Sequence, residues 1–135
     1  LYDEVSEYGV TAHVMNELVD NGKILEVRRF PVTPYDNLPT VLSRTHSELL
    51  NLCSYFISGL YSDGENFLKE KLAALETEVW KGNARLLKEL DALQKIDTNV
   101  SEKELKRVIR ATYIDGYPPK IELHGFTFRL ELDEK

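Results

Sequence analysis

The spacing of hydrophobic residues changes several times along the chain, and each change marks a different predicted element. Near the start, residues 9–15 and 23–32 alternate apolar with polar positions and are rich in β-branched residues, which predicts strands. Pro31 and Pro34 end the second of these segments, and residues 16–22 between the two segments form an acidic turn. We therefore expect two neighbouring strands joined by this turn.

The middle of the chain instead repeats its apolar residues every three or four positions, which is the spacing of amphipathic helices. Asp36 and Asn37 can cap the first of these helices, and Pro39 suits its first turn. Ser101 and Glu104 form a capping box before another helix. We expect helices over residues 38–60, 65–78 and 102–112, and residues 84–96 are good helix formers.

The end of the chain, residues 120–132, returns to alternation on either side of His124 and Gly125, which predicts a terminal β-hairpin. The order strand, strand, helices, hairpin is that of a mixed α/β protein. Because neither pair of strands is enough for a stable sheet, we expect segments upstream of residue 1 to supply further strands. A length of 135 residues suits one domain or part of one.

Charge and hydropathy narrow the classes of function. The chain has 17 basic and 23 acidic side chains, a net charge of −6, and its first basic residue is Lys23. Because such a surface repels a phosphate backbone, we do not expect a nucleic-acid partner. No apolar run approaches the roughly 20 residues that span a bilayer, so we expect no membrane helix.

The single cysteine, Cys53, excludes an internal disulfide, and its spacing from the three histidines does not suit a zinc site. Because Cys53 lies among Leu49, Leu52 and Phe56 in a helical pattern, it is predicted to be a small buried hydrophobe rather than a nucleophile. We predict no metal site and a reducing, cytoplasmic location.

His13 and Asp20 are the candidate catalytic residues. His13 is centred in the first predicted strand, and Asp20 lies in the turn that follows, where α/β enzymes often place reactive groups. A turn aspartate before Asn21 and Gly22 is also a common structural device, because Asn-Gly suits positive φ. On residue type and spacing alone, a structural role is favoured for both candidates.

The sequence from residue 9 to residue 25, Gly-Val-Thr-Ala-His-Val-Met and then Val-Asp-Asn-Gly-Lys-Ile-Leu, resembles the formyltransferases that use 10-formyltetrahydrofolate. That family includes methionyl-tRNA formyltransferase, glycinamide ribonucleotide formyltransferase and the nucleotide-sugar N-formyltransferases. By position, the resemblance implies that Asp20 is the aspartate of an Asn-His-Asp catalytic set and that His13 is the family's strand histidine. Asp20 would then orient a histidine and help to move protons, and His13 would support it.

A weaker resemblance covers the C-terminal end. Ile109, Arg110 and Ala111 lead into the predicted hairpin, as in sugar-formyltransferase catalytic regions, although Arg110 could equally be an ordinary residue at a helix end. The region around Trp80 also resembles that subfamily, but a single tryptophan after a helix is usually a hydrophobic anchor. The chain departs from the family at Lys23, which we expect to place a flexible cation near the site entrance.

The resemblance implies the C-terminal part of a Rossmann-like formyltransferase domain, with residues 1–60 in its catalytic core and residues 61–135 as a helical extension and hairpin. The family's Asn-x-His-Pro segment lies upstream of the Gly-Val-Thr strand, and residues 1–8 do not contain it. We therefore expect a fragment of a larger enzyme that is inactive by itself.

The resemblance implies an N-formyltransferase whose acceptor is the amine of a nucleotide-linked amino sugar and whose donor is 10-formyltetrahydrofolate. The acidic balance counts against a methionyl-tRNA formyltransferase-like enzyme. Two alternatives remain: such a methionyl-tRNA formyltransferase-like enzyme, or a non-catalytic module derived from the same family and kept for binding or for forming a homodimer through its apolar helix faces.

Overall fold

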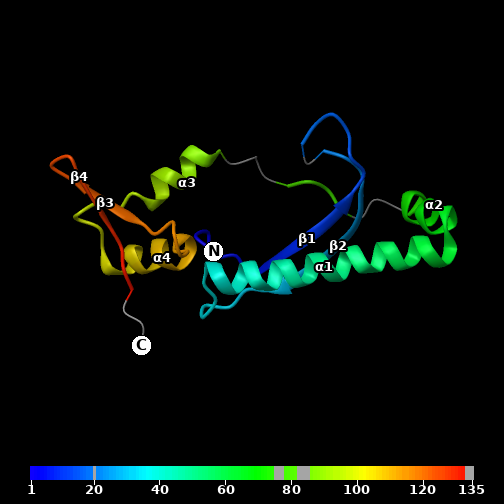
Figure 1. The fold of residues 1–135 in the computed structure, drawn as a ribbon, viewed down its shortest axis with the longest axis horizontal. Helices are drawn as coiled ribbons and strands as arrows, with labels where there is room; N and C mark the ends of the chain where they lie inside the picture. The colour runs from blue at the N-terminus through cyan, green and yellow to red at the C-terminus, as the bar shows by residue number, and fades with distance from the viewer. Residues whose placement is uncertain (20, 75–77, 82–85, 133–135) are drawn as a thin grey trace. The chain divides into compact units, whose positions relative to one another are not determined.

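A computed structural model describes residues 1–19, 21–74, 78–81 and 86–132, and its elements follow one another in mixed α/β order (Figure 1). The strands are β1 (Glu7–His13), β2 (Ile24–Pro31), β3 (Lys120–Leu123) and β4 (Phe126–Arg129). The helices are α1 (Leu38–Asp63), α2 (Glu65–Ala73), α3 (Leu87–Gln94) and α4 (Glu102–Thr112). The element order therefore confirms the α/β fold class.

The chain forms two compact units, and each draws on separate stretches of sequence. One unit contains Leu1–Val5, Val32–Leu42 and Ala84–Lys135, and the other contains Ser6–Pro31 and Ser43–Asn83. The division at residue 60, which was made from the family resemblance, stays a prediction.

In the second unit, β1 and β2 pair antiparallel, which confirms the two neighbouring strands. Tyr8 faces Phe30 and Val10 faces Arg28 across the ladder. Val10 and Phe30 are each 7% exposed, because alternate residues of a strand point to the same face. This buried face gives the strand pair a fixed register.

Aromatic side chains join α1 to α2 in the same unit. Phe67 of α2 meets Tyr55 and Phe56 of α1 edge to face, with ring centroids 5.5 Å apart in each pair. Gly59 makes room for this cluster, since a Cβ there would lie 2.4 Å from the Phe67 ring. The geometry suits the aromatic quadrupoles and fixes the short helix against the long one.

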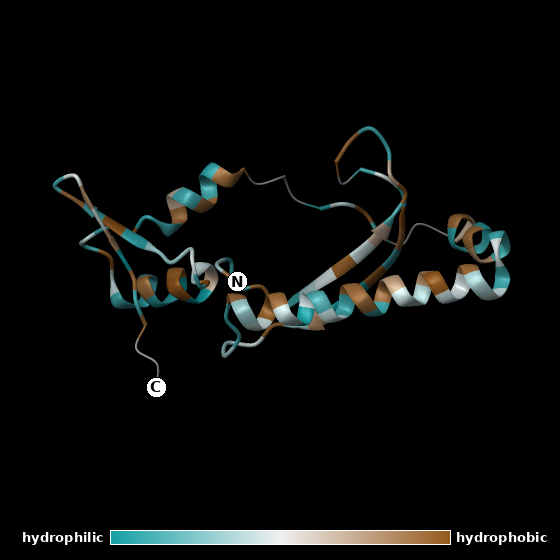
Figure 2. Cartoon of the chain, viewed as in Figure 1, coloured by the Kyte–Doolittle hydropathy of each residue, from teal (hydrophilic) through white to brown (hydrophobic). Residues whose placement is uncertain are grey.

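Cys53 is exposed, so the prediction that it is buried is wrong. Leu52, the residue before it, is 3% exposed and points into the unit. Because successive helix residues are rotated by about 100°, Cys53 lies on a different side of α1 from Leu52. Leu49 and Leu50 are also exposed, by 50% and 69%, and hydrophobic residues recur along the whole of α1 (Figure 2).

The second helix is shorter than predicted. The pattern predicted a helix to residue 78, but α2 ends at Ala73, and residues 75–77 lie outside the described residues. Ala74 is extended, with φ −57° and ψ 142°. The Nζ of Lys23 donates to the carbonyl oxygens of Leu72 and Ala74, at 2.6 and 3.2 Å. A cation therefore satisfies the last carbonyls of α2 where a further helical turn was expected.

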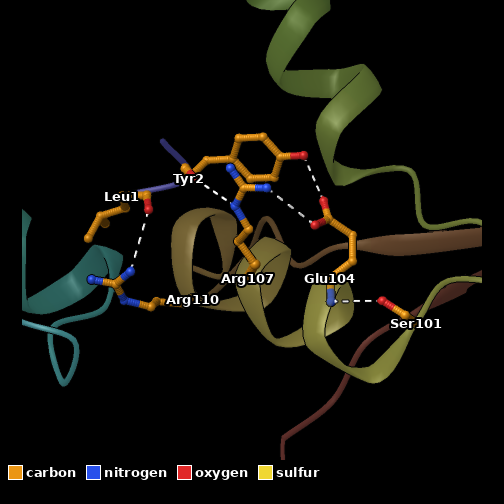
Figure 3. A network of polar contacts seen from close by, with 6 residues as sticks. All are labelled: Leu1, Tyr2, Ser101, Glu104, Arg107 and Arg110. Atoms are coloured by element: carbon orange, nitrogen blue, oxygen red, sulfur yellow. Dashed lines mark hydrogen bonds and ion pairs between the residues drawn. The ribbon is translucent and has the colours of Figure 1, made fainter. Parts of the chain in front are cut away.

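In the first unit, α4 begins at the predicted cap. The Ser101 hydroxyl accepts from the Glu104 backbone N–H at 3.2 Å, and the Glu104 carboxylate accepts from the Tyr2 hydroxyl at 2.6 Å (Figure 3). That carboxylate raises the pKa of the Tyr2 phenol, because it stabilises the protonated form. Arg107 stacks its guanidinium 4.0 Å from the Tyr2 ring centroid and donates to the Tyr2 carbonyl at 2.7 Å. These contacts bind the first residues of the chain to α4.

The strands β3 and β4 form the predicted terminal hairpin, which ends at Arg129. Its two turn residues, His124 and Gly125, have φ values of 50° and 83°. Positive φ at both central positions is the signature of a type I′ turn, which matches the twist of the paired strands. All four residues of β4 are exposed.

Candidate active site

The connection between β1 and β2 includes position 20 of the sequence, and His13 lies directly before it at the end of β1. A bulge interrupts the ladder between Ala12 and His13, and His13 then faces Ile24. One residue further on, the Val14 backbone N–H donates to the Lys23 carbonyl at 2.9 Å. We call residues 14–23 the corner.

Side chains within the corner hydrogen-bond to one another. The Asn16 Oδ1 accepts from the Leu18 backbone N–H at 3.0 Å, and the Asn16 Nδ2 donates to the Asn21 Oδ1 at 3.3 Å. The first of these contacts is an Asx turn, a local device by which asparagine bends the backbone. Asn16 therefore organises the start of the corner and ties it to the end.

Asp20, the predicted catalytic aspartate, lies outside the described residues. Its catalytic role stays a prediction. His13 and the corner residues 14–19 and 21–23 lie within the described part of the chain.

His13 is half-buried at the end of β1, and its Nδ1 lies 3.0 Å from the Val14 carbonyl oxygen. A carbonyl oxygen can only accept, so Nδ1 carries the hydrogen and donates it. In the neutral ring, Nε2 then keeps its lone pair and is the nitrogen able to take up a proton. This assignment follows from the hydrogen bond and gives the imidazole a defined polarity.

Gly22 is required at the corner by close approach. A Cβ at this position would lie 1.6 Å from the Val14 carbonyl oxygen and 3.4 Å from the His13 Nδ1. The glycines with positive φ in the described residues are Gly64, Gly116 and Gly125, so the expectation that Asn-Gly supplies positive φ at Gly22 is wrong. The absence of a side chain instead lets the backbone at Gly22 approach the backbone at Val14.

Trp80 closes the corner from a distant part of the sequence. Its indole N–H donates to the Gly22 carbonyl at 2.7 Å, and its ring meets the His13 ring edge to face, with centroids 5.0 Å apart and an interplanar angle of 88°. The side chain is 38% exposed. Sequence reasoning noted this single tryptophan as a hydrophobic anchor and missed its hydrogen bond.

The ammonium group of Lys23 is held by hydrogen bonds, so the expectation of a flexible cation is wrong, and its place at a site entrance stays a prediction. Its ammonium group binds the two carbonyl oxygens at the C-terminal end of α2 described above. The negative end of the helix dipole attracts a cation at that place. Lys23 therefore fastens the corner to α2.

A shallow pocket of about 220 Å³ lies beside the corner. Its lining combines corner residues with the segment before Trp80: Asn21, Gly22, Lys23, Ile24, Glu78, Val79 and Trp80. Arg29 donates to both Glu78 carboxylate oxygens at 2.7 Å, and this pair lowers the pKa of the Glu78 carboxyl. The pocket wall is therefore held in place by an ion pair from β2.

Arg110, from the C-terminal motif that resembles the sugar formyltransferases, makes hydrogen bonds that hold the fold together. Arg110 donates from Nε to the Asp36 carbonyl at 2.7 Å and from Nη2 to the Thr33 carbonyl at 2.9 Å. A longer contact of 3.5 Å joins Nη1 to the Leu1 carbonyl (Figure 3). The Arg110 guanidinium thus joins the start of the chain and the segment before α1 to α4. Its position at a helix end did not indicate this role.

Among the residues that the structure describes, no group of three or more His, Cys, Asp or Glu side chains is arranged so that it could hold a metal ion. None of the helices found in the same part of the chain has the length and apolar character to cross a membrane.

Comparisons with known proteins identify relatives of this chain. It is 32% identical over 71 residues to phosphoribosylglycinamide formyltransferase of Haemophilus influenzae, over 53% of this chain and 33% of that protein. Its fold matches the crystal structure of Rv3404c from Mycobacterium tuberculosis, a candidate sugar N-formyltransferase, with a TM-score of 0.74 and 18% identity. That match covers 99% of this chain and 57% of the other. No family model matches the sequence.

The chain thus spans about a third of the length of its sequence relative and little more than half of its structural one. The structural match confirms the predicted fold class.

Proposed function

We propose that the gene product of this chain moves a formyl group from 10-formyltetrahydrofolate to the amine of a nucleotide-linked amino sugar, because the chain is similar in sequence to one formyltransferase and in fold to a candidate sugar N-formyltransferase. The observation that carries this proposal is the corner after β1. At its start, the half-buried His13 imidazole, with a defined tautomer, lies at the end of β1 and close to Gly22, the last residue of the Asp-Asn-Gly sequence that the resemblance marks as catalytic.

Formyl transfer makes simple demands on such a site. The neutral amine attacks the formyl carbon, the carbonyl electrons move onto oxygen, and the amine nitrogen gives up a proton. The bond from carbon to the folate nitrogen then breaks, the carbonyl re-forms, and the leaving nitrogen takes up a proton. A carboxylate and an imidazole held together near neutral pH can move these protons.

In our proposal Asp20 orients the catalytic machinery and helps to move the proton. His13 supports Asp20 directly or through a water molecule, with Nε2 as the nitrogen that takes part. A base of this kind typically contributes a factor of about 10² to 10⁴ to the rate. We assign none of the described residues to the binding of the formyl donor.

The two relatives point to different acceptors. The structural relative supports an amino sugar, and the sequence relative supports glycinamide ribonucleotide as a second candidate. The net charge of −6 counts against a transfer RNA acceptor. A panel of amines therefore tests the acceptor separately from the reaction.

The test uses the complete gene product with 10-formyltetrahydrofolate and three classes of amine: nucleotide-linked amino sugars, glycinamide ribonucleotide and methionyl-tRNA. We expect formylation of an amino-sugar nucleotide and a loss of about 10² to 10⁴ in turnover for Asp20→Asn with little change in folding stability. Asp115→Asn, an exposed turn aspartate outside the corner, is the matched control and should retain full turnover.

Each part of the proposal can fail separately. Full turnover of Asp20→Asn would contradict the role of Asp20. Formylation of glycinamide ribonucleotide alone would replace the proposed acceptor with the second candidate. If the gene product formylated none of these amines, the result would favour the non-catalytic module.

A further inference from the structure

We propose that Trp80 is a positioning residue for His13 and for the corner, a role that deepens the proposed function and rests on it. Trp80 lies 58 residues along the chain from Gly22, yet its side chain contacts both Gly22 in the corner and His13, the strand residue just before the corner. It acts through His13, and we do not place it against the reacting atoms.

The first contact fixes the plane of the imidazole. The His13 and Trp80 rings are almost perpendicular, at 88°, and their centroid separation of 5.0 Å lies within the range that edge-to-face pairs prefer. A half-buried imidazole beside such a wall has few other orientations open to it. The orientation that it keeps is the one in which Nδ1 reaches the Val14 carbonyl.

The second contact fixes the backbone that faces the imidazole. The Trp80 indole N–H donates to the Gly22 carbonyl at 2.7 Å, and a Cβ on Gly22 would come within 3.4 Å of the His13 Nδ1. One rigid side chain therefore sets the distance between the end of β1 and the residue that leads into β2.

The segment that carries Trp80 is itself anchored. Glu78, two residues earlier, forms a two-point ion pair with Arg29 of β2, with both distances at 2.7 Å. Planar pairs of this kind restrict geometry more than a single hydrogen bond does. The ion pair therefore fixes the segment that carries Trp80 to β2, the strand that follows the corner.

Partial exposure of the ring separates this role from that of a simple core anchor. At 38% exposure, Trp80 leaves much of its apolar surface in water, whereas Phe67 in the aromatic cluster is 9% exposed. The contacts that Trp80 does make are directional and converge on His13 and Gly22. Such contacts constrain orientation more than they bury area.

The kinetic test is a double-mutant cycle on the complete gene product, assayed for formyl transfer. Trp80→Phe keeps a ring and removes the N–H, and we expect turnover to fall about tenfold with KM unchanged within twofold. In a His13→Asn background, the same change should have almost no further effect, because its target is already lost. A full tenfold loss in that background would overturn the proposal.

Tyr61→Phe is the matched control for this cycle. Tyr61 is 93% exposed on α1 and has no place in the corner, so its loss of a hydroxyl should leave turnover unchanged. A loss of turnover equal to that of Trp80→Phe would show a general response to aromatic substitution and would overturn the proposal.

A nuclear magnetic resonance readout does not depend on catalysis. The ¹⁵N shifts of the His13 ring should report the tautomer with hydrogen on Nδ1 in the native protein, and Trp80→Leu and Trp80→Phe should both shift the balance toward the other tautomer. An unchanged ¹⁵N pattern in Trp80→Phe would overturn the positioning role. If the native protein formylates no amine, the proposed function fails, and the ring shifts still decide whether Trp80 positions His13.

Discussion

The two strand pairs of this protein turn the chain in different ways. β3 and β4 are joined by two residues, and the positive φ values of His124 and Gly125 make that turn from local backbone conformation. The corner between β1 and β2 is longer, and residues that lie 49 to 58 positions away, in α2 and at Trp80, hold it by hydrogen bonds to Lys23 and Gly22. A turn that is fixed partly from outside can be shaped for chemistry, because its own residues need not supply all of its geometry.

Burial separates the two pairs as well. Phe30 of β2 is 7% exposed, whereas Phe126 and Phe128 of β4 are 69% and 56% exposed. The first pair is thus held by packing, and the second is held by its ladder and turn. Changes in the corner should therefore propagate further than changes in the hairpin.

Substituting one glycine in each turn should give the largest contrast. Gly22→Ala places a Cβ 1.6 Å from the Val14 carbonyl oxygen, so the backbone must move, and we expect a loss of roughly 3 kcal/mol in the free energy of unfolding. Gly125→Ala meets open space and costs about 1 kcal/mol, because of its positive φ alone. Denaturant unfolding of the complete gene product measures both.

The same two glycine variants should also differ in turnover. Gly22→Ala should abolish most formyl transfer, while Gly125→Ala should leave it intact. Equal losses of stability in the two variants would show that the corner is held as locally as the hairpin, contrary to the contacts of Trp80 and Lys23.

Those elements that depend on local sequence could be predicted. The His-Gly turn, the cap at Ser101 and the two strands around the corner follow from residue type and period, and the structure confirms them. The side of α1 that is buried did not follow, because apolar residues surround Cys53 on more than one side of the helix. Periodicity identifies a helix more surely than it identifies the inward face.

The site itself could be predicted only in part. The Gly-Val-Thr-Ala-His and Asp-Asn-Gly motifs mark His13 and Asp20, but the structure describes only the first of them. The partners of Lys23 and Trp80 are set by tertiary packing, and no spacing within the sequence encodes which carbonyl each would reach. The reason for Gly22 is likewise visible only once Val14 is placed beside it.

Replacing one lysine in each strand pair should give a smaller contrast. Lys23→Met removes a cation from two carbonyl oxygens at the end of α2, which should cost about 1 kcal/mol of unfolding free energy. Lys120→Met removes a 3.6 Å contact to Glu122 in the hairpin and should cost less than about 0.5 kcal/mol. Thermal unfolding at low and high salt checks both, and a larger loss for Lys120→Met would contradict the view that distant contacts secure the corner.

The smallest contrast between the two strand pairs concerns stability at acid pH. Arg29 lowers the pKa of the Glu78 carboxyl in the corner unit, and Lys95 lowers the pKa of Glu122 in the hairpin, in both cases below the ordinary value of 4.5. A carboxyl with a lowered pKa in the folded state stabilises the protein above its ordinary pKa, and this stabilisation is lost as pH falls through the folded-state pKa. Melting temperatures between pH 6 and pH 3 should therefore fall less steeply in Glu78→Gln and Glu122→Gln than in the native protein. Because the Glu78 pair is two-pointed and planar, Glu78→Gln should flatten the acid limb more than Glu122→Gln, and the reverse order would place the stronger ion pair in the hairpin.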